Sequence, residues 1–340
     1  MDSGLTLEGK LKKNGRMRAG GHALVLLAAP MNVAILRSLS ERPTALIDLR
    51  RAVGAPPQST MRKHLSTLAG AGVLSRTRDG GFAGSASYTL QKPGTDLLGL
   101  ARVVEGWLAA APHGPIDLGT VAAKSAIKAL AEGWSTTLLR ALAARPLTLT
   151  ELDALIGDIS YPSLERRLVA MRMAGQVEAV ASRGRGTPYT VTHWLRRAVG
   201  PLVSAARWER RHLADATAPI GRLDIESAFL LGLPLLSLDD EYTGACRLAV
   251  DTRSKGARRT VGVVVRLAEG RVSHCRARVD GDVTAWASGS VGAWYRGVSE
   301  GRVDLLEVGG DQALLEAIVA GLHASLARPE VAQASADSRI

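Results

Sequence analysis

The sequence predicts an α+β protein, in which two similar, mostly helical domains with β-hairpins precede a smaller α+β domain. An internal repeat supports the first part, because residues 35–74 align with residues 138–177 without a gap and share 11 of 40 positions. A change of pattern after residue 220 supports the second, since apolar residues there alternate as they do in strands.

Charge is divided in the same way along the chain. Residues 1–110 hold 15 Lys/Arg against 7 Asp/Glu, residues 111–220 hold 14 against 9, and residues 221–340 hold 14 against 16. The net charge of +11 therefore comes from the repeated part. This asymmetry indicates either a polyanionic partner for the repeats or an ordinary solvated basic surface.

The chain has 340 residues, 46% of them hydrophobic, which is enough for several cores. The expected division is a basic tail, two repeated domains, an α+β domain and a flexible tail, at residues 1–20, 21–112, 120–214, 222–328 and 329–340. The longest apolar runs are interrupted and fall short of the ~20 residues that a membrane helix needs. We therefore expect no membrane span and a cytoplasmic location. Two cysteines, Cys246 and Cys275, are too few for a disulfide framework.

Each copy contains the same predicted elements in the same order. A first helix at residues 32–40 or 135–143 ends at a proline turn, and a second begins at Thr44 or Thr148, whose hydroxyl can cap it. A third helix follows in each copy, with buried apolar positions at i, i+4 and i+7: Met61, Leu65 and Leu68, or Leu164, Leu168 and Met171. It ends at Gly72 or Gly175, and two short strands then form a hairpin.

Three helices and a β-hairpin make the winged helix-turn-helix arrangement. The second copy, "LLRALAARPLTLTELDALIGDISYPSLERRL" with Trp134 before it and "TPYT" after it, resembles the HxlR-type winged-helix regulators. The resemblance covers about residues 134–195 and, through the repeat, residues 31–108. That family usually has one such domain per chain and dimerises, whereas this chain carries two.

In a winged helix, the exposed face of the third helix meets phosphates and base edges in the major groove. The residues expected to bind DNA in the first copy are Gln58, Ser59, Thr60, Arg62, Lys63 and Ser66 on the helix, with Arg76 and Arg78 on the wing. Those expected in the second copy are Tyr161, Ser163, Arg166 and Arg167 on the helix, with Arg183 and Arg185 on the wing. The second copy has Pro162 and Glu165 where the first has Ser59 and Arg62, so we expect the first copy to be the stronger reader.

A long amphipathic helix is expected after each hairpin, at residues 95–111 and 192–213, with Trp107 and Trp208 at matching places. The resemblance implies that these helices join the two copies as an intramolecular pseudo-dimer. Alternatively, each faces another chain and the protein forms a homodimer. Both tryptophans can also be plain core residues.

The last third resembles the C-terminal half of sterol-carrier-protein-type lipid-binding domains over about residues 245–327: a strand, a Gly-Ser turn, a helix with Trp294 and Tyr295, an acidic strand, then "GGDQALLEAIVAGL". The resemblance implies a sheet with helices over one face and an apolar pocket. The expected ligand-binding residues are Trp286, Trp294, Tyr295, Leu231 and Leu235, with residues 225–238 as a lid. The alternative is that these side chains form the core of a small α+β domain.

Together these features predict a ligand-responsive transcriptional regulator that binds double-stranded promoter DNA at the bacterial nucleoid and responds to a small apolar or aromatic ligand. The alternative is a binding protein that sequesters a hydrophobic compound and uses the winged helices as a scaffold. The seven histidines lack metal-ligand spacing, and neither a phosphate-binding loop nor a GxSxG motif is present. We therefore expect neither an enzyme nor a cofactor.

Overall fold

The computed structural model describes residues 19–78, 86–133, 137–157, 159–182, 186–213, 219–254 and 257–327. It confirms the mixed α+β class, with helices and several sheets along the chain. The chain divides into two compact units: unit 1 comprises Met1–Ala131 and Ser204–Pro219, and unit 2 comprises Glu132–Val203 and Ile220–Ile340. The predicted domain at residues 120–214 is thus shared between the units, and the division falls inside two helices, α7 (Val121–Gly133) and α12 (Val199–His212).

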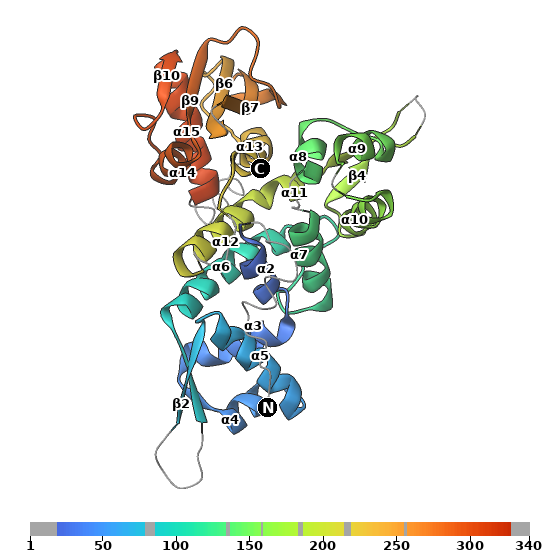
Figure 1. Cartoon of the computed structure of the whole chain (residues 1–340), viewed down its shortest axis with the longest axis vertical. Coiled ribbons are helices and arrows are strands. Elements are labelled where there is room, and N and C mark those ends of the chain that lie inside the picture. The colour runs from blue at the N-terminus through green and yellow to red at the C-terminus, as the bar shows by residue number, and fades with distance from the viewer. Residues whose placement is uncertain are drawn as a thin grey trace. The chain divides into compact units, whose positions relative to one another are not determined.

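Unit 1 contains the first copy of the repeat (Figure 1). Its elements are α2 (Gly21–Leu27), α3 (Pro30–Glu41), β1 (Thr44–Ala45), α4 (Leu46–Ala52), α5 (Gln58–Gly70), β2 (Leu74–Arg78), β3 (Ala86–Leu90), α6 (Lys92–Ala109) and α7 (Val121–Gly133). The three strands form one antiparallel sheet in the order β1-β3-β2. The apolar side chains predicted to face inward on the third helix, Met61, Leu65 and Leu68, are buried, and α5 packs on α3, where Ile35 and Leu36 are also buried.

The second copy has the same order in unit 2. Its elements are α8 (Thr137–Ala144), α9 (Leu149–Leu155), α10 (Tyr161–Met173), β4 (Val177–Ala179), β5 (Tyr189–Val191), α11 (His193–Arg197) and the start of α12. The backbone pairing repeats as well, because the bridge between Thr44 and Tyr88 has its counterpart in the bridge between Leu147 and Tyr189.

These counterparts obey the offsets of the sequence repeat, 103 before the hairpin tip and 101 after it, as does the pairing of Leu74 with Leu90 and of Val177 with Val191. The glycine that ends the third helix is left-handed in both copies, with φ +67° at Gly72 and +71° at Gly175, a conformation that favours glycine. The two copies therefore share their backbone structure, including the register of their paired strands.

Two local predictions were wrong, one in the first copy and one in the helix that follows the second copy. Thr44 does not cap the second helix, because α4 begins at Leu46 with Ala45 as its N-cap, and the Thr44 hydroxyl donates to the carbonyl of Arg42 instead. The single helix predicted over 192–213 is divided at Ala198 into α11 and α12. Pro201 lacks the N–H that would continue the hydrogen-bond ladder across this point. Helices α2 and α7 were not predicted.

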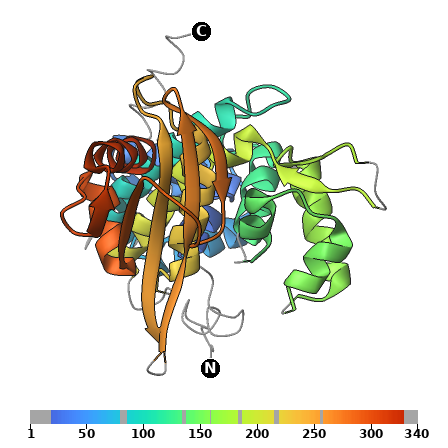
Figure 2. The same cartoon turned by 90° about the horizontal axis from the view of Figure 1, so that it is seen from above.

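The last third folds into a five-stranded sheet with helices (Figure 2). Its elements are α13 (Arg222–Gly232), the 3-10 turn η1 (Leu233–Leu235), β6 (Gly244–Ser254), β7 (Ala257–Ala268), β8 (Arg271–Arg276), β9 (Ala285–Ser290), α14 (Val291–Glu300), β10 (Glu307–Gly310) and α15 (Gln312–Ala327). The strand order is β10-β9-β6-β7-β8, with β6 and β9 parallel and the other pairs antiparallel. The strand, the helix with Trp294 and Tyr295, the acidic strand and the final segment expected from the resemblance are present as β9, α14, β10 and α15.

The two faces of this sheet differ in chemistry. Helices α13, α14 and α15 pack on one face, where the alternate residues Leu248, Val250, Val263 and Val265 are fully buried. The intervening residues lie on the opposite, outer face, among them Arg247, Val264, Arg266 and Trp286. The apolar segment 225–238, predicted as a lid, forms α13 and η1 and is mostly buried.

Within the described parts of the chain, no single helix is long and apolar enough to cross a membrane. Helices α2 and α3 reach the required length and composition only together, and they meet at a bend of 81°.

Candidate nucleic-acid interface and ligand domain

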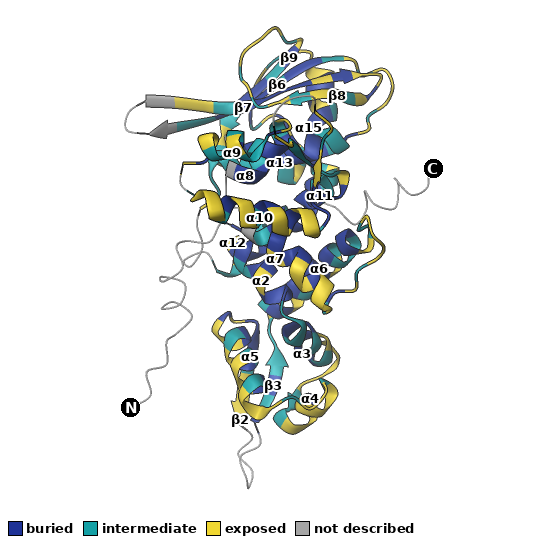
Figure 3. Cartoon of the chain, turned by 90° about the vertical axis from the view of Figure 1, so that its right-hand side faces the viewer, coloured by how far each residue is buried: buried dark blue, intermediate teal, exposed yellow. Residues whose placement is uncertain are grey.

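Helix α5 presents a polar, basic face to solvent in the first copy. Gln58, Ser59, Arg62, Lys63 and Ser66 are exposed, and Thr60 is half-buried. The exposed parts of α5 appear in yellow in Figure 3. Since the opposite stripe of the helix is buried, the core fixes which side chains point outward. We call the exposed set, with Thr60, the α5 face.

The positive charges of the α5 face have no acidic partner among the residues that the structure describes. Across the ranges that the structure describes, no carboxylate lies within ion-pairing distance of Arg62 or Lys63. Arg51, one helix earlier, does pair with Asp48. Two free cations on one helix face give a concentrated positive potential that suits a polyanion.

A partly buried hydrogen-bond chain links α5 to α3 and α2. The Nδ1 of His64 lies 2.8 Å from the Oδ1 of Asn32, and the Nδ2 of Asn32 donates to the carbonyl of Leu26. Burial, and to a lesser extent the nearby Lys63, lowers the pKa of His64, which favours the neutral ring. The basic face is therefore carried by a helix whose rotation is fixed by packing and by this polar contact.

The predicted wing residues are described only in part. Arg76 on β2 is exposed, and Arg78 occupies the strand position paired with Ala86. Arg183 and Arg185 of the second copy lie outside the described residues. The structure thus places Arg76 on the same module as the α5 face.

The corresponding helix of the second copy has a different surface. At the positions of Gln58, Ser66 and Gly70 it carries Tyr161, Val169 and Met173, which are 45%, 54% and 80% exposed. Of the other predicted residues, Arg166 is exposed and donates to the Ser163 hydroxyl, while Ser163 and Arg167 are half-buried. The α10 surface therefore exposes apolar side chains at positions where α5 has Gln58, Ser66 and Gly70, beside the exposed charges of Glu165 and Arg166.

The end of α12, which follows the second copy, belongs to unit 1 and packs on the helices of the first copy. The indole N–H of Trp208 donates to the carbonyl of Pro93, and the Nε2 of His212 lies 2.9 Å from the Oδ2 of Asp96, both on α6. The hydrogen bond from Lys92, followed by that from His212, lowers the pKa of Asp96.

A second contact of α12 is made by Glu209, which is fully buried. Its carboxylate accepts the backbone N–H groups of Gly20 and Ala23 at 2.7 and 2.9 Å and so caps the start of α2. Burial raises the pKa of Glu209 to about 7, although the backbone hydrogen bonds oppose this shift. The chain segments that follow the two copies are therefore joined within unit 1.

Helix α13 joins the second copy to the sheet within unit 2. Arg140 of α8 forms a two-pronged ion pair with the buried carboxylate of Glu226, and its Nη2 lies 3.1 Å from Oε1. The Nη1 of Arg196, on α11, donates to the carbonyl of Leu230 at 2.7 Å. In the first copy the matching arginine, Arg37, pairs instead with Glu105 at the surface.

The predicted ligand-binding residues lie mostly in the core. Trp294 is fully buried, donates its indole N–H to the carbonyl of Ala249 and packs edge-on against Phe229. Leu231 is also fully buried, and Leu235 and Tyr295 are half-buried. A ligand could reach Trp294 or Leu231 only if α13 or α14 moved. Trp286 lies elsewhere, half-buried on the outer face of the sheet, where the Arg247 guanidinium is 5.9 Å from its ring centre.

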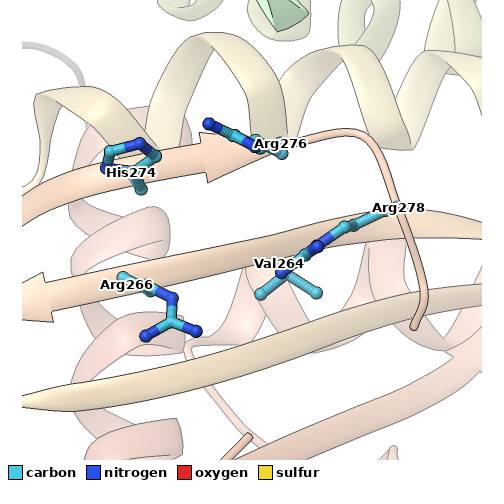
Figure 4. A pocket seen from close by; sticks show the side chains of 5 residues that line it. All are labelled: Val264, Arg266, His274, Arg276 and Arg278. Atoms are coloured by element: carbon cyan, nitrogen blue, oxygen red, sulfur yellow. The ribbon is translucent and has the colours of Figure 1, made fainter. Parts of the chain in front are cut away.

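A hollow of about 270 Å³ lies on the outer face of the sheet (Figure 4). It is lined by Val264, Arg266, His274, Arg276 and Arg278, and we call it the cationic hollow. Its residues come from two strands and from the connection after β8, so no local sequence pattern brings them together. The alternation of Arg266 with buried valines, and the spacing of His274, Arg276 and Arg278, were the available signals.

The described residues contain no group of three or more His, Cys, Asp or Glu arranged to hold a metal ion. Burial raises the pKa values of the Cys246 and Cys275 thiols to about 12, so neither is an activated nucleophile.

No protein-family model matches the chain, and no curated protein matches its sequence.

Proposed function

We propose that this protein is a DNA-binding transcriptional regulator built from two tandem HxlR-like winged helix-turn-helix domains and a sterol-carrier-like ligand-binding domain. The observation that carries the proposal is the α5 face, on which Arg62 and Lys63 are exposed and without a carboxylate partner among the described residues. It lies on the third helix of a module whose element order supports the winged-helix assignment.

The α5 face has the chemistry of a recognition helix. Arg62 and Lys63 can bind phosphates or guanine edges, while Gln58, Ser59 and Ser66 supply hydrogen-bonding groups for base edges or phosphates. Arg76, on a strand of the same module, is a candidate for a backbone contact next to the groove.

The two copies have different roles in this proposal. Tyr161, Glu165 and Val169 stand on α10 where the first copy has Gln58, Arg62 and Ser66, so in this proposal the first copy reads DNA and the second connects the reader to the rest of the chain. The contacts of α12 with α6 and α2 support an intramolecular pseudo-dimer. A homodimer of the whole chain remains compatible with this arrangement.

Ligand control requires a route between the ligand domain and a DNA-binding copy. The Arg140–Glu226 pair and the Arg196–Leu230 bond supply one, because both end on α13, which packs on the sheet. The expected ligand is a small apolar or aromatic molecule. In the alternative function, sequestration of a hydrophobic compound, the same contacts would serve only as a scaffold.

Fluorescence anisotropy with a labelled duplex from the region upstream of the protein's own gene tests the proposal. The test variant is Arg62→Gln/Lys63→Gln. Arg102→Gln/Lys124→Gln is the matched control, since it removes the same charge from exposed positions of α6 and α7 in unit 1. We expect the test variant to lose about tenfold in affinity and to reduce the slope of log affinity against log salt by about two, because each phosphate contact contributes about one.

Binding that is equally weak in both variants would show a general effect of charge and contradict a role for α5. Absence of salt-sensitive binding to any duplex would favour the sequestration function.

A further inference from the structure

We propose that the cationic hollow binds the oxyanion group, phosphate or carboxylate, of a small molecule. Three guanidinium groups and one imidazole line it, and no carboxylate is among the lining residues. Its volume of about 270 Å³ lies near the lower end of the ~300–1,000 Å³ that small-molecule sites occupy.

Strand register places the lining residues together. Val264 pairs with Arg276 and Arg266 pairs with His274, so β7 and β8 present two rows of side chains to the same outer face. The buried Val264 forms an apolar floor between them. Exposed side chains of Arg266, His274 and Arg276 surround this floor, and Figure 4 shows them on two adjacent strands.

The connection after β8 gives the site its third side. β8 lies at one edge of the sheet and β9 lies beyond β7 and β6, so residues 277–284 cross between them. The Nη1 of Arg247 donates to the carbonyl of Val279 at 3.4 Å, which ties this connection to β6 on the outer face. Arg278 enters the hollow from the connection, and its guanidinium lies over Gly281, where a side chain would meet it at 3.2 Å.

Positive charges that line one hollow repel one another, and a bound oxyanion offsets that repulsion while accepting several hydrogen bonds. The fork of an arginine is suited to two oxygens of one phosphate or carboxylate. A concave site with an apolar floor encloses a small group, whereas proteins usually bind a nucleic-acid backbone along an extended groove. We therefore assign the site to a small molecule and treat nucleic acid as the competing outcome.

The position of the site also connects it to the second copy. Cys275 lies between His274 and Arg276 on β8, is half-buried, and faces the side of the strand opposite to the hollow, as does the Arg196 side chain of α11 that lies near it. An anion bound in the hollow and the Arg196 side chain therefore lie on opposite sides of β8. Regulation of DNA affinity from this site depends on the proposed function, but binding itself does not.

Thermal unfolding of the full chain at constant ionic strength tests the site, with chloride replaced by inorganic phosphate, pyrophosphate or malonate. Phosphate and pyrophosphate probe the phosphate source, and malonate probes the carboxylate source. We expect at least one of the three to raise the melting temperature in a saturable way. Arg266→Gln/Arg276→Gln should weaken that effect by at least about tenfold in apparent affinity. The matched control is Arg172→Gln/Arg296→Gln, which removes the same charge from exposed positions of unit 2 and should bind as the wild type does.

The melting temperature without anion separates binding from structure. If the arginines serve a ligand, Arg266→Gln/Arg276→Gln should melt at the same temperature as the wild type or higher, because repulsion is relieved. A lower melting temperature together with an unchanged anion effect would overturn the proposal, as would equal effects of all three anions on both double variants.

A short single-stranded DNA that displaces pyrophosphate, and binds more tightly than all three anions, would assign the hollow to nucleic acid instead. Failure of this inference and failure of the proposed function are distinguishable. If duplex binding needs α5 but no anion raises the melting temperature, only the proposal for the hollow is contradicted. Anion binding without duplex binding contradicts only the regulator.

Discussion

The indole N–H of Trp208 donates to the backbone carbonyl of Pro93, 2.8 Å away and 115 residues earlier in the chain. This bond attaches the helix that follows the second copy to the helix that follows the first. Trp208 is 4% exposed, so its ring also fills a packed site between these helices.

Replacement of Trp208 by Phe removes the donor and part of the ring. We expect a loss of about 1–3 kcal/mol in the free energy of unfolding, from an unsatisfied carbonyl and a small cavity. Urea unfolding followed by circular dichroism measures it. Trp286→Phe, at a half-buried position on the outer face of the C-terminal sheet, is the control and should cost less. Equal losses would show that the bond to Pro93 contributes nothing of its own.

The repeat supplies its own test of helix capping. In the second copy the Thr148 hydroxyl accepts the Glu151 N–H, and the Glu151 carboxylate accepts the Thr148 N–H, which completes a capping box. The hydrogen bond from the Thr148 backbone, followed by that from Arg145, lowers the pKa of Glu151. We expect Thr148→Ala to cost about 1 kcal/mol of stability.

Thr44→Ala is the control, because Thr44 caps no helix. At the place of Thr148 the first copy has Ala45, so Ala45→Thr should add a cap and raise stability by about 0.5–1 kcal/mol. Urea unfolding of the three variants measures both effects. A larger loss from Thr44→Ala than from Thr148→Ala would contradict the assignment.

Glu209 makes stability depend on pH. Its pKa is about 7 in the folded chain against 4.5 for an ordinary glutamate, so the folded state holds an extra proton between these values. The stabilisation is therefore complete below about pH 4.5 and is lost as pH rises through about 7, by at most about 3 kcal/mol.

The measurement is the difference in unfolding free energy between the wild type and Glu209→Gln from pH 4.5 to 8. We expect the wild type to lose stability relative to the variant as pH rises. Burial lowers the pKa of His22, which gives the opposite trend, but His22 is present in both proteins. A difference that stays constant with pH would contradict a protonated Glu209.

The contrast between α5 and α10 predicts a gain of function. Tyr161→Gln, Glu165→Arg and Val169→Ser together place the first copy's residues on α10. We expect DNA affinity to rise by about threefold or more, with a salt slope steeper by about one, provided that this face reaches the duplex. Glu316→Arg makes the same charge change on α15 and is the control. Equal gains would show attraction by net charge alone.

Much of the fold was predictable because periodic burial is local. The spacing of Met61, Leu65 and Leu68 identified both the buried stripe and the exposed residues of α5, and the repeat carried the same reasoning to α10. The cap at Thr44 was wrong by one residue, although the gapless alignment already places Ala45 opposite Thr148.

In the C-terminal α+β domain, local sequence patterns did not predict the site. Apolar composition does not distinguish the wall of a pocket from a filled core, and Trp294 and Leu231 belong to the core. The cationic hollow is assembled from two strands and a crossing connection, so it depends on a strand order that no local pattern reveals.

The bond between Glu209 and Gly20 spans 189 residues. A ribosome makes ~5–20 residues per second, so α2 waits ~10–40 s for its capping carboxylate. All residues of unit 1 are consequently available for folding only after residues 132–203 of unit 2 have been synthesised. The first copy thus completes its folding only when a segment translated much later reaches it, and a chain truncated before residue 209 lacks the cap on α2.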